Sequence, residues 1–227
     1  MMNRISTEDN FNFLFYALIF LLFSIAAVEQ FASGVGQHFI VAVTVITLVI
    51  SVLSIRQQKV WFRTGLGITF SLLLVIVVGT LFELAELDVM YLLLMLGFFL
   101  FTTVIAARQV LFTGEITGNK IVGAVCIFIL LGLIWAMMYL LLLELDPNTL
   151  NNVADDKWYN NFAFVVYFSF VTLTTLGYGD ISPALPIARF LAYSEAMMGQ
   201  FYIAVMVASL VGVRIANLSA SKQHKDQ

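Results

Sequence analysis

The stretch that decides the fold reads Thr172-Leu173-Thr174-Thr175-Leu176-Gly177-Tyr178-Gly179-Asp180. It follows a short apolar and aromatic segment, 161–172, and precedes a long apolar one. Glycine readily adopts a positive φ angle, which residues with side chains avoid. Alternation of glycine with other residues therefore allows successive carbonyl groups to face one side of an extended chain. A row of such oxygens, repeated around an axis, can replace the water shell of an alkali cation.

The composition places this stretch in a membrane. Of the 227 residues, 61% are apolar and 11% are charged, and the mean hydropathy is +0.98. Soluble domains carry about 45–50% apolar and roughly 25% charged residues. The net charge of −3 provides no basic face for nucleic acid, and Cys126 is the single cysteine, so no intrachain disulfide is possible. We therefore expect an all-α integral membrane protein in a lipid bilayer, with no soluble substrate.

The apolar stretches predict the number of membrane spans. A helix needs about 20 mostly apolar residues to cross roughly 30 Å of hydrocarbon. Six stretches meet this requirement: Phe11–Val28, Phe39–Ile55, Thr64–Phe82, Val89–Ala107, Ile121–Leu143 and Ile187–Ala216. The segment 161–172 is too short to span and is predicted to be a re-entrant helix. Asn160 and Asn161 are suited to cap the N-terminus of this helix, expected over Phe162–Thr172.

Loop charges predict the orientation. Nine of the 11 cationic residues fall on the side of the two termini, and only Lys157 and Arg189 fall on the other. Cytoplasmic loops carry an excess of Lys and Arg, so both termini are expected in the cytoplasm of a multi-pass cell-membrane protein. An even number of spans agrees with this orientation. The small extramembrane part favours a prokaryotic inner membrane.

The stretch 172–180 resembles the selectivity filter of the tetrameric potassium channels. The resemblance implies that K⁺ is the permeant ion and is coordinated by the backbone oxygens of four residues: Thr175, Leu176, Gly177 and Tyr178. It also implies that the Thr175 hydroxyl completes the innermost ring, that Thr174 and Gly179 support the filter, and that Asp180 lies at the outer mouth. The family usually has Val or Ile where this chain has Leu176. A weakly selective cation channel therefore stays open as an alternative to a potassium-selective one.

One chain carries one such loop, and a closed ring of oxygens requires four, so a homotetramer with fourfold symmetry is expected. In the last span, Gly199 follows Gly179 by 20 residues. This spacing matches the family's hinge position in the inner helix, although close packing of Gly199 is an equal alternative.

Two polar residues, Glu195 and Gln200, interrupt the last apolar stretch. The resemblance implies that Gln200 faces a water-filled cavity. A carboxyl group within a membrane is a functional candidate because its burial without a partner is unfavourable. We interpret Glu195 as hydrogen-bonded support behind the filter, near Thr172 or Thr174, with the protonation of its carboxyl group left open, and a gating proton sensor is the weaker alternative. Val171 stands where some relatives have Glu, so the Glu–Asp pair that braces those filters is absent.

The expected organisation is a four-helix membrane domain over 1–118, a pore domain over 119–216 and a short cytoplasmic tail over 217–227. The first domain resembles a voltage sensor, but Val89–Ala107 holds no charged residue. Conventional voltage gating is therefore not expected. Two other classes stay open, a transporter subunit, which would show inverted repeats, and a non-conducting scaffold. No nucleophile–base pair or phosphate loop is found, so the protein is not expected to be an enzyme.

Overall fold

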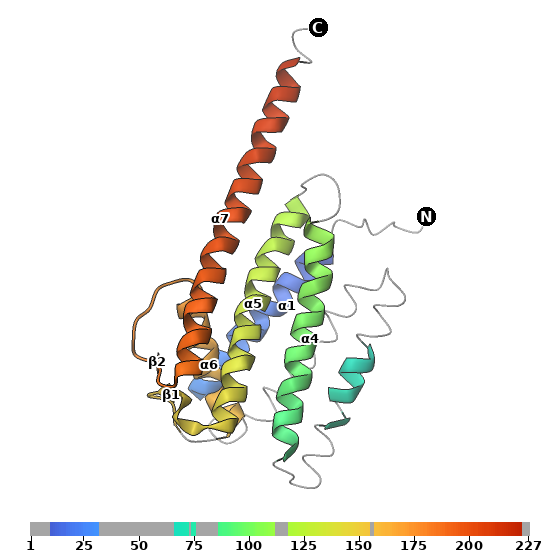
Figure 1. Cartoon of the computed structure of the whole chain (residues 1–227). Helices are drawn as coiled ribbons and strands as arrows, with labels where there is room; N and C mark the ends of the chain where they lie inside the picture. Colours follow the sequence, from blue (N-terminus) through green and yellow to red (C-terminus); the bar gives the residue numbers. More distant parts are fainter. Residues whose placement is uncertain are drawn as a thin grey trace.

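The computed structural model describes residues 10–31, 66–72, 74–75, 86–111, 118–154 and 157–223. They form a helical bundle (Figure 1) with five long or medium helices: α1 (Asn10–Phe31), α4 (Glu86–Leu111), α5 (Gly118–Leu145), α6 (Trp158–Leu173) and α7 (Pro186–Gln223). The second predicted span lies outside the described residues. Of the third, residues 66–72 and 74–75 are described and are helical.

Three of the described helices are long and apolar enough to cross a membrane, namely α1, α4 and α5. They coincide with the first, fourth and fifth predicted spans. The sixth predicted span is helical as well, since α7 continues for 38 residues and projects beyond the ends of α4 and α5 (Figure 1). It is not among the three described helices that meet both the length and the apolarity of a membrane span, and its first half contains Arg189, Glu195 and Gln200. The described residues thus support a multi-pass membrane protein, and the total of six spans stays a prediction.

Helix α5 is central to the described bundle, because α1, α4, α6 and α7 all contact it. One continuous hydrophobic core joins the helices and includes Phe11 of α1, Phe99 of α4, Leu133 of α5 and Phe162 of α6. The division of the chain at residue 118 stays a prediction. Within the described residues, α1 and α4 share their core with α5 and α6.

Helix α6 begins one turn earlier than the sequence predicts. Its N-cap is Lys157, which makes no side-chain capping bond, so the predicted capping by Asn160 and Asn161 is wrong. The buried Trp158 explains the extension, because its indole Nε1 donates to Asp88 Oδ1 of α4 at 3.1 Å. Asn161 lies inside the first turns and donates from Nδ2 to the carbonyl oxygen of Ala154 at 3.0 Å.

Two short strands connect the end of α5 to the segment that follows the filter-like stretch. After a 3₁₀ turn over Pro147–Thr149, β1 (Leu150–Asn151) pairs antiparallel with β2 (Ser182–Pro183). Asn151 Nδ2 also donates to Ser182 Oγ at 3.1 Å. The end of the stretch 172–180 is therefore attached to the loop that leaves α5.

Candidate functional site

The residues after α6 adopt an unusual backbone conformation. From residue 176 to residue 179 there is no regular secondary structure. Every second φ angle is positive: +59° at Thr175, +60° at Gly177 and +79° at Gly179. A Cβ atom at either glycine would meet nothing within 4 Å, so the backbone angle, and not lack of space, is what requires glycine here. Alternation of the sign of φ permits neighbouring carbonyl groups to face the same side.

The inner part of the stretch is held by the last turn of α6. The backbone N–H of Leu176 donates to the Val171 carbonyl oxygen at 2.9 Å, and that of Gly177 donates to the same oxygen at 3.3 Å. The Thr175 N–H donates to the Thr172 carbonyl oxygen at 2.9 Å. The terminal carbonyl groups of α6 thus gain donors that a helix end otherwise lacks. Thr174 contributes through its Oγ1, which donates to the carbonyl oxygen of Phe170 at 2.6 Å.

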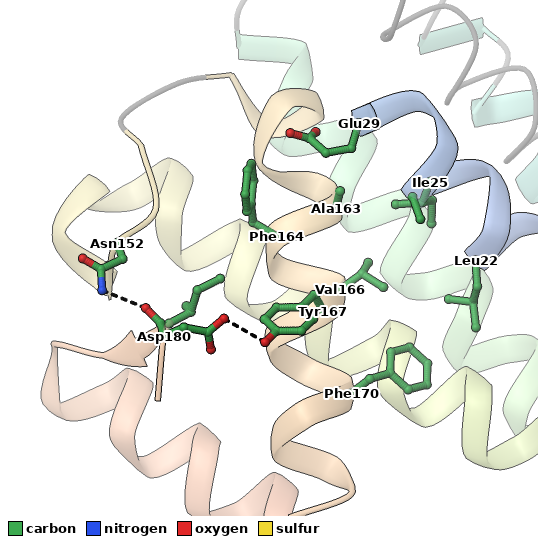
Figure 2. Close-up of a pocket in the computed structure, with 12 residues that line it drawn as sticks. Leu22, Ile25, Glu29, Asn152, Ala163, Phe164, Val166, Tyr167, Phe170 and Asp180 are labelled. Atoms are coloured by element: carbon green, nitrogen blue, oxygen red, sulfur yellow. Dashed lines mark hydrogen bonds between the residues drawn. The ribbon is translucent and has the colours of Figure 1, made fainter. Parts of the chain in front are cut away.

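The C-terminal end of the stretch is held through Asp180 (Figure 2). Tyr167 of α6 donates from its hydroxyl to Asp180 Oδ2 at 2.7 Å, and Asn152 Nδ2 donates to the Asp180 carbonyl oxygen at 2.7 Å. The hydrogen bond from Tyr167 lowers the pKa of the exposed Asp180 carboxyl below its ordinary value. The sequence places Asp180 at this end but does not identify Tyr167, because nothing distinguishes it from the other aromatic residues of α6.

An open groove of about 640 Å³ lies between α1 and the outer part of α6 (Figure 2). Leu22 and Ile25 of α1 face Val166 of α6 across it, and Glu29 and Asp180 add polar groups to its lining. The first helix therefore lies beside the segment that carries the filter-like stretch.

Helix α7 contacts the inner end of the stretch at two consecutive residues. A Cβ atom at Gly199 would overlap the Leu173 carbonyl oxygen at the end of α6. Gly199 thus allows the backbones of α6 and α7 to touch, and α7 is an uninterrupted helix through this position. Close packing is observed, while the hinge stays a prediction. Gln200 is exposed, and its Nε2 donates to Thr175 Oγ1 at 3.2 Å.

One turn earlier on α7, Glu195 is fully buried behind α6. The Tyr139 hydroxyl of α5 donates to Glu195 Oε2 at 2.8 Å, and Ser169 Oγ of α6 lies 2.5 Å from Glu195 Oε1. The expected hydrogen-bonded environment is present, but the expected neighbours, Thr172 and Thr174, are wrong. The hydrogen-bond partners of Glu195 are instead Ser169 and Tyr139. The spacing of residues within α7 predicts neither partner, because they lie on other helices.

Comparisons with known proteins match the part of the chain that contains this site. Residues 124–214 match the family model described as "Ion channel", which includes most of α5 and all of α6 together with the filter-like stretch. A segment of 49 residues is 39% identical to "Two pore potassium channel c" of Oryza sativa subsp. japonica. This match covers 22% of the present chain and only 11% of the rice protein. No solved structure matches the chain.

These matches, and the membrane-length helices that surround the site, support an ion channel and not an enzyme.

Proposed function

We propose that four copies of this chain form a passive, potassium-selective channel. Its filter consists of the backbone carbonyl groups of Thr175, Leu176, Gly177 and Tyr178. The observation that carries the proposal is the positive φ at Thr175, Gly177 and Gly179, directly after the end of α6. The match of residues 124–214 to an ion channel family supports conduction. The printed name of the rice relative supports K⁺ as the permeant ion.

Elementary electrostatics explains how such a site handles a cation. Rings of carbonyl oxygens replace the hydration shell, so that a K⁺ ion enters without a large free-energy barrier. Helix α6 ends at Leu173, immediately before the filter. The negative partial charge at this C-terminal end favours a cation near the inner mouth. The ionised carboxylate of Asp180 favours cations at the outer mouth.

The exposure of the filter-like stretch in one subunit supports the proposed fourfold assembly. Leu176 is 60% exposed and Tyr178 is 69% exposed, although both side chains are apolar or aromatic. Contact with neighbouring copies around a common axis covers such side chains and closes the ring of oxygens. K⁺ is then the permeant cargo, and no resident cofactor is required.

The proposed orientation places the start of α4 and the start of α6 on the outer side, with both termini in the cytoplasm. The positive-inside rule is the basis of this assignment. Lys157 Nζ lies 4.0 Å from Asp88 Oδ2, so two segments that the rule assigns to the same side are close together. This proximity supports the proposed topology.

A weakly selective cation channel is the second candidate, and Leu176 favours it. The backbone oxygen of Leu176 remains available, but its side chain has a shape that differs from Val or Ile. Because filter geometry depends on packing behind the carbonyl groups, this difference changes how well the ring fits K⁺ relative to Na⁺.

The test uses the purified full-length protein in liposomes with K⁺ on one side and Na⁺ on the other. We expect a reversal potential near the K⁺ equilibrium potential. Gly177→Ala should abolish this selectivity, because a side chain at φ +60° is strained by about 1 kcal/mol in each subunit. Gly97→Ala on α4 is the matched control, since a Cβ atom there meets nothing within 4 Å and φ is not positive.

The outcomes separate the candidates. A reversal potential near zero with appreciable current would favour the weakly selective channel. No current in wild-type protein that is folded and assembled would contradict conduction and would favour a scaffold. Selective current that survives Gly177→Ala unchanged would show that the filter lies elsewhere.

A further inference from the structure

A buried polar cluster joins the three helices α5, α6 and α7 behind the filter-like stretch. Its centre is the carboxyl group of Glu195, which has no exposed surface. Tyr139 Oη lies 2.8 Å from Glu195 Oε2, and Ser169 Oγ lies 2.5 Å from Glu195 Oε1. Ser169 Oγ also lies 2.7 Å from the carbonyl oxygen of Gly132. Four oxygen-bearing groups therefore form three contacts, all at hydrogen-bond distance.

The number of protons in this cluster can be counted. The Ser169 hydroxyl has one proton but has two oxygen neighbours, the Gly132 carbonyl and Glu195 Oε1. A backbone carbonyl has no proton to give, so the short contact with Gly132 requires the proton of Ser169. The contact between Ser169 and Glu195 then requires a proton from the carboxyl group. An ionised carboxylate accepts only and cannot supply it.

We infer that Glu195 is a neutral carboxylic acid that donates its proton to Ser169 and thereby positions the pore-lining end of α6. The hydrogen bonds then run in one direction, from the Tyr139 hydroxyl to Glu195, from Glu195 to Ser169, and from Ser169 to Gly132. This chain begins and ends on α5 and passes through α7 and α6. Every proton in it has one acceptor.

The surroundings agree with a neutral group. Among the residues that the structure describes, the hydrogen-bond partners of Glu195 are the Tyr139 hydroxyl from α5 and the Ser169 hydroxyl from α6, and neither carries a positive charge. Tyr139 packs edge-on against Phe168, and both side chains are buried in the core. An ion without a counterion is strongly disfavoured in such a place, whereas a hydrogen-bonded neutral acid is tolerated.

The hydrogen-bond chain fixes the position of the end of α6 that precedes the filter-like stretch. Ser169 lies two residues before Val171, whose carbonyl oxygen holds the backbone of Leu176 and Gly177. A donor from α7 and an acceptor on α5 together fix the Ser169 side chain. Glu195 is thus a positioning residue, since it reaches the filter only through α6. The inference depends on contacts within one subunit and not on the ion selectivity proposed above.

Infrared difference spectroscopy tests the proton directly. Full-length protein in lipid vesicles is compared with Glu195→Gln at neutral pH. We expect the variant to lose one carbonyl stretching band of a protonated carboxylic acid. Glu29→Gln is the matched control, because this exposed side chain on α1 should give no such band. The absence of any band that Glu195→Gln removes would overturn the inference.

A second variant keeps the test decisive if Glu195→Gln does not assemble. Tyr139→Phe removes only the donor to Oε2, so the same band should persist and shift to a higher frequency. An unchanged band frequency in Tyr139→Phe would contradict the proposed hydrogen-bond chain. This readout needs no ion flux, so a failed filter and a failed proton assignment are distinguishable.

Ion flux provides the functional readout. Glutamine offers an N–H donor and a carbonyl acceptor in the same shape as the neutral acid. Glu195→Gln should therefore keep the K⁺ flux within about twofold of wild type, whereas Glu195→Ala should lower it by about tenfold through the partners left unsatisfied. Equal loss of flux in both variants, with assembly intact, would contradict the role of a neutral donor.

Discussion

At the scale of single residues, the proposed outer mouth depends on one hydroxyl group. The bond from Tyr167 to Asp180 Oδ2 favours the ionised carboxylate and lowers its pKa below the ordinary value of 3.8. For a group with a lowered pKa, the stabilising bond is complete above the ordinary value. It is lost as the pH falls through the pKa of the folded protein. The bond is therefore intact at neutral pH and breaks only under strong acid.

Tyr167→Phe should raise the pKa of Asp180 toward its ordinary value. Acidification of the outer side should then reduce the K⁺ current at a higher pH than in wild type. The measurement is the current through liposome-reconstituted protein as the outer pH is lowered. Tyr159→Phe, the same change on the same helix, should leave the midpoint where it is. Equal midpoints in wild type and Tyr167→Phe would show that this hydroxyl does not control Asp180.

At the scale of elements, the contact between α4 and α6 rests on the indole of Trp158. Its Nε1 donates to Asp88 Oδ1, while the nearby Lys157 is half-exposed at 4.0 Å and adds little. Removal of the acceptor leaves a buried N–H group without a partner.

The two substitutions Asp88→Ala and Asp88→Asn separate the contribution of the acceptor oxygen of Asp88 from that of its charge. Asp88→Ala should destabilise the fold by about 1–3 kcal/mol, because the Trp158 N–H loses its acceptor. Asp88→Asn keeps an acceptor oxygen at the same place and should cost much less. Thermal unfolding of the two variants in detergent gives the comparison. An equal loss of stability in the two variants would mean that the charge of Asp88, which both remove, and not its acceptor oxygen, is what matters.

The contact between Trp158 and Asp88 shows which helix positions could be predicted from the sequence and which could not. Apolar length alone is sufficient for α1, α4 and α5, because a membrane span needs little else. The filter-like stretch is recognisable in the sequence because the positive φ angles at Gly177 and Gly179 favour glycine, and this preference depends only on the stretch itself. The start of α6 was misplaced because it depends on Asp88, 70 residues away in sequence. The partners of Glu195 were missed for the same reason, since three separate helices meet there.

At the scale of the whole molecule, the lack of charge over residues 89–107 of α4 predicts the response to voltage. Residues 89–107 contain no charged side chain, and Arg108 lies in the last turn of the helix. A membrane potential acts on α4 only weakly, because the work scales with the charge that moves.

We therefore expect the conductance of reconstituted protein to change only shallowly with voltage. Arg108→Gln should leave that dependence unaltered, because a single charge at the helix end crosses little of the field. The measurement is the conductance–voltage relation in planar bilayers. A steep sigmoidal relation would show that gating charges exist in a part of the chain outside α4.

The buried contact of Glu195 also has a consequence for how the chain is made. A carboxyl group that enters a bilayer alone is unfavourable. Helix α7 follows α5 and α6 in the sequence, so the ribosome delivers Tyr139 and Ser169 before Glu195. The last of these helices thus reaches a membrane in which both hydroxyl partners of its carboxyl group have already been synthesised. The two hydrogen-bond partners of the Glu195 carboxyl group therefore precede it in the order of synthesis.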